Sequence, residues 1–199
     1  MDPQDAAEMM EQERERDAFK KRAAILIAFF AMLLAITGLG SNNAMKEALN
    51  ENIAASNAYN FYQAKNMRQT SYNLAADQIE LAWSQVPALP EGARTALRAK
   101  AADYKKTAAR YDSEPDTGEG KKELLIKARD HDAKRDKALK QDPYFDYAEA
   151  LLQIAIVLIS VSIVADQRWL TILGAGLGAI GGFLMINGFL LLVEIPGLG

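Results

Sequence analysis

Three long runs without a charged residue constrain this chain more than any other feature. Residues 23–45, 150–165 and 169–193 contain no Asp, Glu, Lys or Arg, and together they make up 64 of the 199 residues. The remaining 135 residues carry all 49 charges. The mean hydropathy of −0.12 and the net charge of −3 therefore average over two unlike kinds of sequence, and they do not describe one ordinary soluble domain.

Each uncharged run has the length of a membrane-spanning helix. At about 1.5 Å per residue, residues 23–40 reach about 27 Å and residues 169–193 about 37 Å, against a hydrocarbon core of about 30 Å. The middle run also reaches about 27 Å when it is extended to residues 148–165. We therefore predict three transmembrane helices over these ranges. The short polar link at residues 166–168 joins the last two as an antiparallel hairpin.

The first 22 residues form a charged tail with seven acidic and five basic side chains. Such a segment is unlike the short, positively charged N-terminal region of a cleavable signal peptide, so the first span is predicted to be an uncleaved anchor. Six Lys and Arg residues lie close to the spans on the N-terminal side of the membrane and five on the opposite side. Because long segments translocate largely regardless of charge, we expect the tail in the cytoplasm and residues 41–147 outside it.

Residues 41–147 are predicted to form an extramembrane helical stalk. Pro and Gly cluster at residues 87–92 and 113–120, and these breakers divide the segment into helices at about 44–86, 91–112 and 121–141. The first helix is about as long as the other two together, so the chain can leave the membrane along one helix and return along two. The expected fold is all-α, with three transmembrane helices and an antiparallel coiled-coil stalk.

Apolar and small residues recur at the 3-4 spacing of a coiled-coil seam in the first of these helices. That predicted seam consists of Tyr72, Ala75, Ile79, Ala82 and Val86. A narrow, Ala-rich stripe marks the second helix and a thinner one the third. Those stripes contain Ala93, Leu97, Ala101, Tyr104, Ala108 and Tyr111, and Leu124 or Leu125, Ala128 and Leu139. Because none is wide enough to bury a large core, the stalk is expected to need partner helices.

Glycines spaced four apart mark one face of the last span. Gly174, Gly178 and Gly182 form a ridge that lets transmembrane backbones approach closely, so we predict helix packing there. The same stretch also matches G-x-G-x-x-G, but a dinucleotide site needs that pattern between a strand and a helix. Within an uncharged run of 25 residues, the packing interpretation is favoured.

A few polar residues inside or beside the spans are candidates for a polar pathway or for oligomer contacts. Glu149 lies at the start of the second span, where it either belongs to an ion path or sits in the first helical turn, wetted by headgroups. Asn187 lies in the last span and is expected to form an interhelical hydrogen bond. In the stalk, Asn52, Asn60 and Gln63 belong to an Asn- and Gln-rich stripe that faces either neighbouring copies or solvent.

Composition excludes several kinds of chemistry. With no Cys and a single His, His131, the chain has neither a thiolate metal site nor a multi-histidine one. No nucleophile–base motif or phosphate-binding loop is visible, so no cofactor is expected and the chain is not predicted to be an enzyme. The charge balance is not basic enough to suggest a nucleic-acid partner.

Two long stretches and a short one carry a resemblance to a known family. They are NIAASNAYNFYQAK at residues 52–65, DPYFDYAEALLQIAIVL at residues 142–158 and RWL at residues 168–170. In this succession, after an N-terminal anchor, the chain resembles the bacterial "domain of unknown function 4337" family of membrane proteins. The resemblance implies the same architecture and a bacterial inner membrane, and it carries over no catalytic residues. Together with the orientation expected from the basic residues, an inner membrane would place the stalk in the periplasm.

The leading functional hypothesis is a structural one. The seams, the glycine ridge and the lack of visible chemistry favour an oligomeric membrane scaffold or accessory subunit. Such a protein would contact membrane lipids, other copies of itself and a protein partner through the stalk. The alternative hypothesis is a subunit of an oligomeric ion channel or transporter, with Glu149 and the Asn-rich stripe near a symmetry axis.

Overall fold

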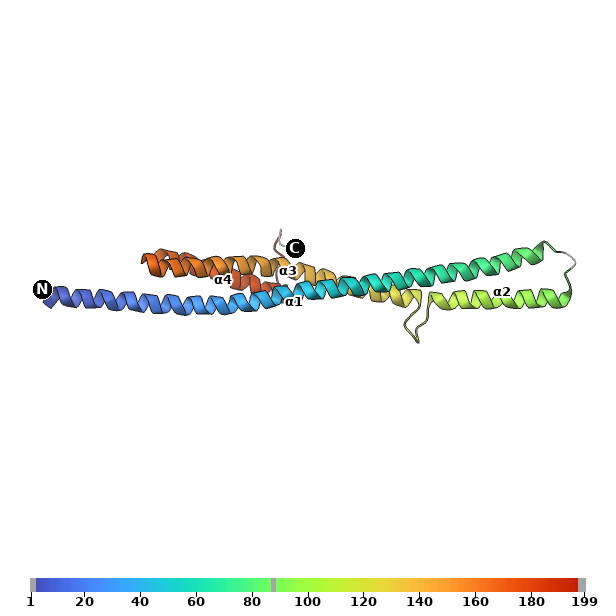
Figure 1. Ribbon diagram of the computed structural model, residues 1–199, viewed down its shortest axis with the longest axis horizontal. Coiled ribbons are helices and arrows are strands. Elements are labelled where there is room, and N and C mark those ends of the chain that lie inside the picture. The colour runs from blue at the N-terminus through green and yellow to red at the C-terminus, as the bar shows by residue number, and fades with distance from the viewer. Residues whose placement is uncertain (1–2, 87–88, 197–199) are drawn as a thin grey trace. The chain divides into compact units, whose positions relative to one another are not determined.

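The computed structural model describes residues 3–86 and 89–196, with side chains described from residue 8 onward. Within those ranges the chain forms the helices α1 (Pro3–Ser84), α2 (Glu91–Asp112), α3 (Lys121–Ala165) and α4 (Arg168–Leu190), which Figure 1 shows. The described residues contain no strand, so the expected all-α class is confirmed.

The chain divides into two compact units. Unit 1 combines Met1–Ala48 with Asp136–Gly199, and unit 2 consists of Leu49–Arg135. Helices α1 and α3 each contribute residues to both units, whereas α2 belongs to unit 2 and α4 to unit 1.

Helix α1 runs through 82 residues without a break. The sequence analysis separated the tail, a span at residues 23–40 and a helix at about 44–86, and the structure joins all three. Residues 41–44 contain neither Pro nor Gly, and polar side chains near this junction bond back to the helix itself. The Asn42 amide donates to the Gly38 carbonyl over 2.7 Å, and the Thr37 hydroxyl donates to the Leu33 carbonyl over 2.8 Å. Such bonds satisfy polar groups without interrupting the helix.

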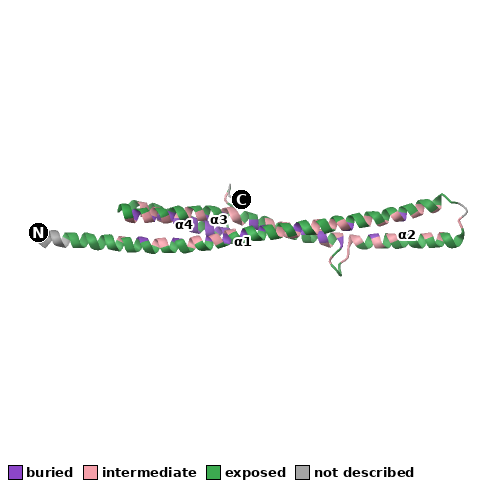
Figure 2. Cartoon of the chain, viewed as in Figure 1, coloured by how far each residue is buried: buried purple, intermediate pink, exposed green. Residues whose placement is uncertain are grey.

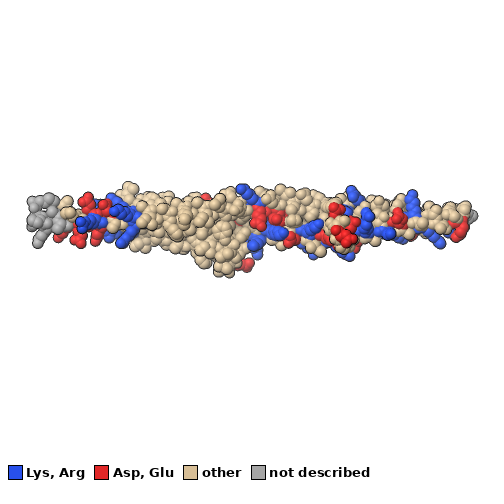
Figure 3. Space-filling view, turned by 90° about the horizontal axis from the view of Figure 1, so that it is seen from below, with Lys and Arg blue, Asp and Glu red and all other residues tan. Residues whose placement is uncertain are grey.

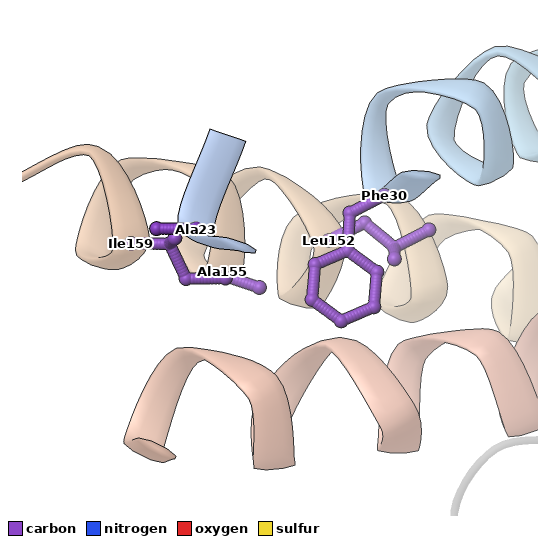
Figure 4. Close-up of a cluster of buried hydrophobic side chains, with 5 residues drawn as sticks. All are labelled: Ala23, Phe30, Leu152, Ala155 and Ile159. Carbon is purple, nitrogen blue, oxygen red and sulfur yellow. The ribbon is translucent and has the colours of Figure 1, made fainter. Parts of the chain in front are cut away.

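The core of unit 1 is built where α1, α3 and α4 contact one another. One buried cluster joins Ala23 and Phe30 of α1 to Leu152, Ala155 and Ile159 of α3, as drawn in Figure 4. A second cluster joins residues of α3 and α4, and its members are Tyr144, Ala148, Leu184 and Met185. Small residues recur among these contacts, which lets the helices approach closely.

The helices of unit 1 keep a broad apolar surface. Each of α1, α3 and α4 contains a stretch that is long and apolar enough to cross a membrane. Large apolar side chains stay highly exposed there, such as Ile25 at 70%, Val164 at 89% and Ile172 at 74%. Figure 3 shows a wide surface that is nearly free of Lys, Arg, Asp and Glu. A soluble monomer rarely exposes so large an apolar surface to water.

The turn between α3 and α4 is held by ion pairs from the start of α1. Asp166 adopts a left-handed conformation with φ of 53°, which reverses the chain between Ala165 and Arg168. Arg16 pairs with Asp166, and Glu15 pairs with Arg168, whose guanidinium also lies over the Phe19 ring. These surface contacts place the charged end of α1 beside the turn.

In unit 2, one face of α1 packs against the rest of the unit. We call it the inner face; its residues recur at alternating spacings of four and three and are all buried or half-buried, as the burial colours of Figure 2 illustrate. The inner face consists of Glu51, Ala55, Ala58, Tyr62, Lys65, Gln69, Tyr72, Ala76, Ile79 and Trp83.

The faces of the unit 2 helices differ in part from the predicted seams. On α1, Ala76 is fully buried, whereas Ala82 and Val86 are exposed. The predicted seam began on the correct residue, Tyr72, but it continued three residues later, at Ala75, whereas the inner face continues four residues later, at Ala76. Because both residues are alanine, the sequence pattern does not distinguish the two spacings. On the other helices, Ala93 and Leu139 are exposed. The remaining predicted stripe residues of α2 and α3 are buried or half-buried.

The helix breakers act at only some of their positions. The turn between α2 and α3 lies within the predicted cluster at residues 113–120, and Gly118 adopts a φ of 65° that favours glycine. The predicted helix at about 121–141 and the predicted span at 148–165 are instead one helix, because α3 continues from Lys121 to Ala165 with Pro143 inside it. The next two residues, Tyr144 and Phe145, are both buried, and their packing holds the helix together across the backbone bond that proline removes.

Candidate functional site

The glycine ridge of α4 lies against the two other helices of unit 1. Gly174, Gly178 and Gly182 are all buried or nearly so. A Cβ atom on Gly174 would lie 2.7 Å from Ile159 of α3, and one on Gly178 would collide with three ring atoms of Phe30 of α1, with Cε1 at 2.7 Å. On Gly182 it would meet Leu33 at an ordinary 3.4 Å. Within the ridge, Gly174 and Gly178 are therefore the positions where contact excludes a side chain.

A second aromatic contact, which the sequence analysis did not single out, lies at Phe145 of α3. Its ring packs between Gly40 of α1 and Gly188 of α4, where added Cβ atoms would lie 2.7 Å and 2.8 Å from the ring. Phe189 meets the same ring edge-on, with centroids 4.8 Å apart. The only sequence signal was a glycine in each of two apolar helices, and it does not indicate which aromatic residue fills the space.

Glu149 lies on the outer side of unit 1, half-buried on α3. Its Oε1 accepts a hydrogen bond of 3.1 Å from the amide of Gln153, one turn further along the helix, and Gln153 is exposed. The pair thus forms a polar patch on the surface of the apolar stretch, whereas the neighbouring Ala148 and Leu152 enter the core.

Asn187 is fully buried and bonds within its own end of the chain. Its side-chain nitrogen donates to the Val193 carbonyl over 2.8 Å, and its side-chain oxygen accepts from the Val193 amide over 2.9 Å. The expected interhelical hydrogen bond is therefore not what these atoms form. The residues after α4 fold back over its end, and the Asn187 amide satisfies the backbone N–H and C=O of Val193, which lies outside the helix.

Hydrogen bonds also join the segment after α4 to α3. The Tyr144 hydroxyl donates to the Val193 carbonyl over 3.2 Å and accepts from the Ile195 amide over 3.0 Å. Gln141 adds a bond to the carbonyl of Phe189. Asn187 and Tyr144 together anchor the backbone of this segment.

The Asn- and Gln-rich stripe of α1 divides between two faces. Asn52, Asn60 and Gln63 are exposed in the single chain. Gln69 is half-buried on the inner face, where it donates to the carbonyl of Ala108 and accepts from Lys121. The stripe therefore supplies polar contacts within unit 2 at one end and leaves the three predicted residues on the surface.

A buried lysine, which the sequence analysis missed, anchors the turn between α2 and α3. Lys65 has 7% of its side chain exposed, and its Nζ lies 3.5 Å from carboxylate oxygens of both Glu114 and Glu119. The ammonium group also lies 5.3 Å from the ring centres of Phe61 and Tyr111, within the range of cation–π attraction. A lysine inside a polar helix carries no sequence signal of burial, so only the folded turn identifies it.

The single histidine contributes to a polar network that joins α1 to α3. His131 Nδ1 lies 2.5 Å from Glu51 Oε2, and both side chains are partly buried. Next to this pair, the Tyr59 hydroxyl donates to Asp132 over 2.8 Å, and Asp132 also pairs with Arg135. The hydrogen bond to Asp132 is the main cause that raises the pKa of Tyr59 above its ordinary value. These contacts hold the two helices together, as the inner-face packing does.

The described residues suggest no metal centre. Within residues 3–86 and 89–196, no group of three His, Asp or Glu side chains is arranged to hold a metal ion. Over the same ranges, every buried side-chain nitrogen or oxygen has a hydrogen-bond partner. The buried polar side chains of these ranges are therefore hydrogen-bonded within the chain.

Comparison with known proteins places the chain in a family. The family model described as "Domain of unknown function (DUF4337)" matches residues 19–191, which include the apolar stretches and all of unit 2. No curated protein and no solved structure matches the chain. Because the match covers most of its length, the chain belongs to the DUF4337 family, as the resemblance in sequence suggested.

Proposed function

We propose that this DUF4337 family member is a multi-pass protein of a bacterial inner membrane, where it acts as a non-enzymatic oligomeric scaffold or accessory subunit. The observation that carries the proposal is the continuity of α1 and α3, each of which extends from an apolar stretch of unit 1 into unit 2. A membrane anchor and a water-exposed helical unit that share two helices suit a protein whose task is to hold partners at the membrane.

The surface of unit 1 supports the membrane location. Its exposed Ile, Leu, Val and Phe side chains would be solvated by lipid tails, which remove the unfavourable contact with water. Two of its three most buried polar side chains, Thr37 and Ser162, bond to carbonyls of their own helices, and Asn187 bonds to Val193. Such internally satisfied groups suit a helix bundle in lipid.

The contacts of unit 2 support a structural role. Lys65 and His131 are the side chains whose chemistry most resembles that of a catalytic group. Lys65 of α1 pairs with two glutamates of the turn between α2 and α3, and His131 of α3 pairs with a glutamate of α1. Both side chains contribute to packing and anchoring. This use of polar residues favours a scaffold over an enzyme.

The distribution of positive charge supports the orientation. Lys and Arg beside a span favour the cytoplasmic side, and the N-terminal end of the apolar stretch of α1 carries Lys20, Lys21 and Arg22. Arg168, in the turn between α3 and α4, pairs with Glu15 near the same end of α1. We propose that the tail and this turn lie in the cytoplasm and unit 2 in the periplasm.

Single cysteines test the membrane location and orientation, because the chain has no native Cys. Thr117, Met9 and Gln167 are exposed, and Cys at these positions can be treated with a membrane-impermeant thiol reagent in spheroplasts. We expect Thr117→Cys to react in intact spheroplasts, and Met9→Cys and Gln167→Cys to react only after lysis. The inverse pattern would reverse the orientation. Extraction of the protein from membranes by alkaline carbonate would contradict a multi-pass anchor.

The scaffold role is tested by what the full chain binds. Purified in mild detergent, the protein should have a mass above that of one 21.8 kDa chain or should retain a specific protein partner, as measured by light scattering and mass spectrometry. A folded monomer without any partner would contradict the proposal.

A channel or transporter subunit is the second candidate, and the polar patch of Glu149 and Gln153 favours it. A carboxylate on the outer surface of an apolar helix is costly to expose to lipid, so it gains from a polar neighbour or an aqueous path. Ion flux into liposomes that contain the protein, changed by Glu149→Gln, would support this function. Absence of flux from well-folded protein would count against it.

A further inference from the structure

We infer that the outward face of α1 in unit 2 is a pairing surface for a second copy of this chain, aligned in parallel and in register. This inference rests on the proposed membrane anchor, and it names the partner that the scaffold binds. The surface is defined by residues that recur every seven positions, namely Ile53, Asn60, Met67, Leu74 and Leu81, and we call it the outer seam.

The outer seam is apolar and uncovered within the chain. Ile53, Met67, Leu74 and Leu81 are exposed to 58%, 71%, 57% and 59%. It is distinct from the inner face, because α2 and α3 pack on residues such as Ala55, Tyr62 and Ala76 and leave the outer seam free. Helix α1 therefore has two faces in unit 2, and the single chain buries the inner face but not the outer seam.

The spacing of the outer seam specifies a helix as the occupant. A strict period of seven keeps a row of side chains against a partner helix only when the two helices coil around each other. The positions three residues after each seam residue are exposed as well, and they hold the polar residues Ser56, Gln63, Thr70, Asp77 and Ser84. Alternating spacings of three and four thus continue along the whole face.

The uncharged flanks of the seam fit an identical copy. In a parallel pair of identical helices, the residues that flank the seam on one chain lie close to the flanking residues of the other. If all of these residues had the same charge, they would repel each other. The flanking positions from residue 50 to residue 78 hold Asn, Tyr, Ala, Ser or Gln, and Glu80 is the first charged one. From residue 50 to residue 76 the face is thus compatible with itself, whereas at Asp77 an in-register copy brings two carboxylates together, which opposes pairing at that one position.

The membrane anchor fixes the direction and the register. Two copies held by the same spans leave the membrane in the same direction, so equivalent residues face each other and Asn60 meets Asn60. A single Asn among apolar residues at this seam position favours two strands and one register, at some cost in stability. From Leu49 to Leu81 the seam and its flanks engage about 20 residues per chain, at the lower end of specific interfaces.

Cross-linking of adjacent positions tests the inference. The full chain in native membranes, carrying either Met67→Cys or Arg68→Cys, is treated with a mild thiol oxidant. Met67 lies on the outer seam, whereas Arg68 is exposed just beside it and serves as the matched control. Paired seam positions lie within disulfide range, so we expect the Met67→Cys disulfide dimer to exceed that of Arg68→Cys by about tenfold. Equal cross-linking of both variants, or a heavier product with another protein, would overturn the inference.

Charge placed on the seam provides a second measurement. Ser56 and Gln63 are exposed, so Ser56→Glu with Gln63→Glu leaves the fold of a single chain intact, which the helical content checks. The opposed carboxylates should raise the dissociation constant between copies by about tenfold or more, while glutamate at Arg68 should have a smaller effect. An unchanged constant would refute the outer seam.

The mass of the purified complex separates this inference from the proposed function. A mass of two chains with seam cross-linking supports both. More than two copies, or a stable complex without seam cross-linking, would overturn the paired seam and leave the scaffold role standing. A folded monomer without a partner would overturn both.

Discussion

The contact between Gly178 and Phe30 allows a quantitative test of how the helices of unit 1 pack. Gly178→Ala adds one methyl group where three atoms of the Phe30 ring lie, the most distant of them at 2.7 Å. Phe30 is 4% exposed and belongs to the core cluster, so its ring has little room to move. Overpacking of this kind costs about 1–3 kcal/mol.

Gly176→Ala is the matched control, because Gly176 lies two residues away in α4 and its added Cβ would meet nothing within 4 Å. Replacing a helical glycine by alanine stabilises a helix by about 0.5–1 kcal/mol, and both variants gain that amount. The two variants should therefore differ by about 2 kcal/mol. By the scaling of soluble chains of this size, that difference lowers the apparent Tm of Gly178→Ala by about 4–8 °C relative to Gly176→Ala.

The assay is thermal stability of the purified protein in mild detergent, read as the temperature at which half of it leaves the monodisperse peak in size-exclusion chromatography. A double-mutant cycle adds Phe30→Ala, which opens space for the new methyl group. In that background Gly178→Ala should cost little, which gives a coupling energy of about 1–3 kcal/mol. If Gly178→Ala melts like Gly176→Ala, or if the cycle is additive, the packing argument is wrong.

Three further predictions concern polar groups. Burial, and next the charge of Asp146, raise the pKa of Asp142, so the native state binds that proton more tightly than the unfolded chain. Stability is then lost as the pH rises through the raised pKa, and Asp142→Asn should raise Tm at neutral pH but not below the ordinary Asp pKa of about 3.9. A pH series in detergent checks this, and an equal gain at every pH would contradict it. Lys65→Met removes the ammonium group from Glu114 and Glu119 and should destabilise the turn between α2 and α3 by about 1–2 kcal/mol. Faster cleavage there by a glutamate-specific protease measures the effect, whereas Lys100→Met, on an exposed residue, should leave the rate unchanged. Asn187→Ala removes both side-chain bonds to Val193, at about 1–3 kcal/mol, so hydrogen exchange of the Val193 amide should accelerate while that of core amides stays the same.

Several properties follow from the sequence because they depend on composition along the chain. Three apolar stretches and the absence of strand alternation predict helices that are able to cross a membrane, and α1, α3 and α4 contain those stretches. The turn between α2 and α3 lies where Pro and Gly cluster. The formation of these helices and the position of this turn depend on local free energies, namely the cost of exposing polar backbone groups and the cost of Pro or Gly inside a helix. Contacts between residues far apart in the sequence are therefore not needed to predict them.

The tertiary structure decides properties that depend on partners far along the chain. Ala75 and Ala76 are chemically identical, and only the contact with other helices makes Ala76 the buried one. Pro143 lies inside a helix, and the two residues that follow it, Tyr144 and Phe145, are buried against other parts of unit 1, which favours the helix there. Asn187 bonds to Val193 because the chain folds back after α4, and Lys65 is buried because two glutamates of a distant turn reach it.

The physical reason is that periodicity defines which residues share a face and leaves open what that face contacts. Along α1, spacings of three and four describe both the inner face and the outer seam. The sequence by itself determined that the chain is helical and divided between apolar and charged stretches. Only the tertiary structure decided that α2 and α3 cover one face of α1 and leave the other exposed, because packing free energy depends on which surfaces meet.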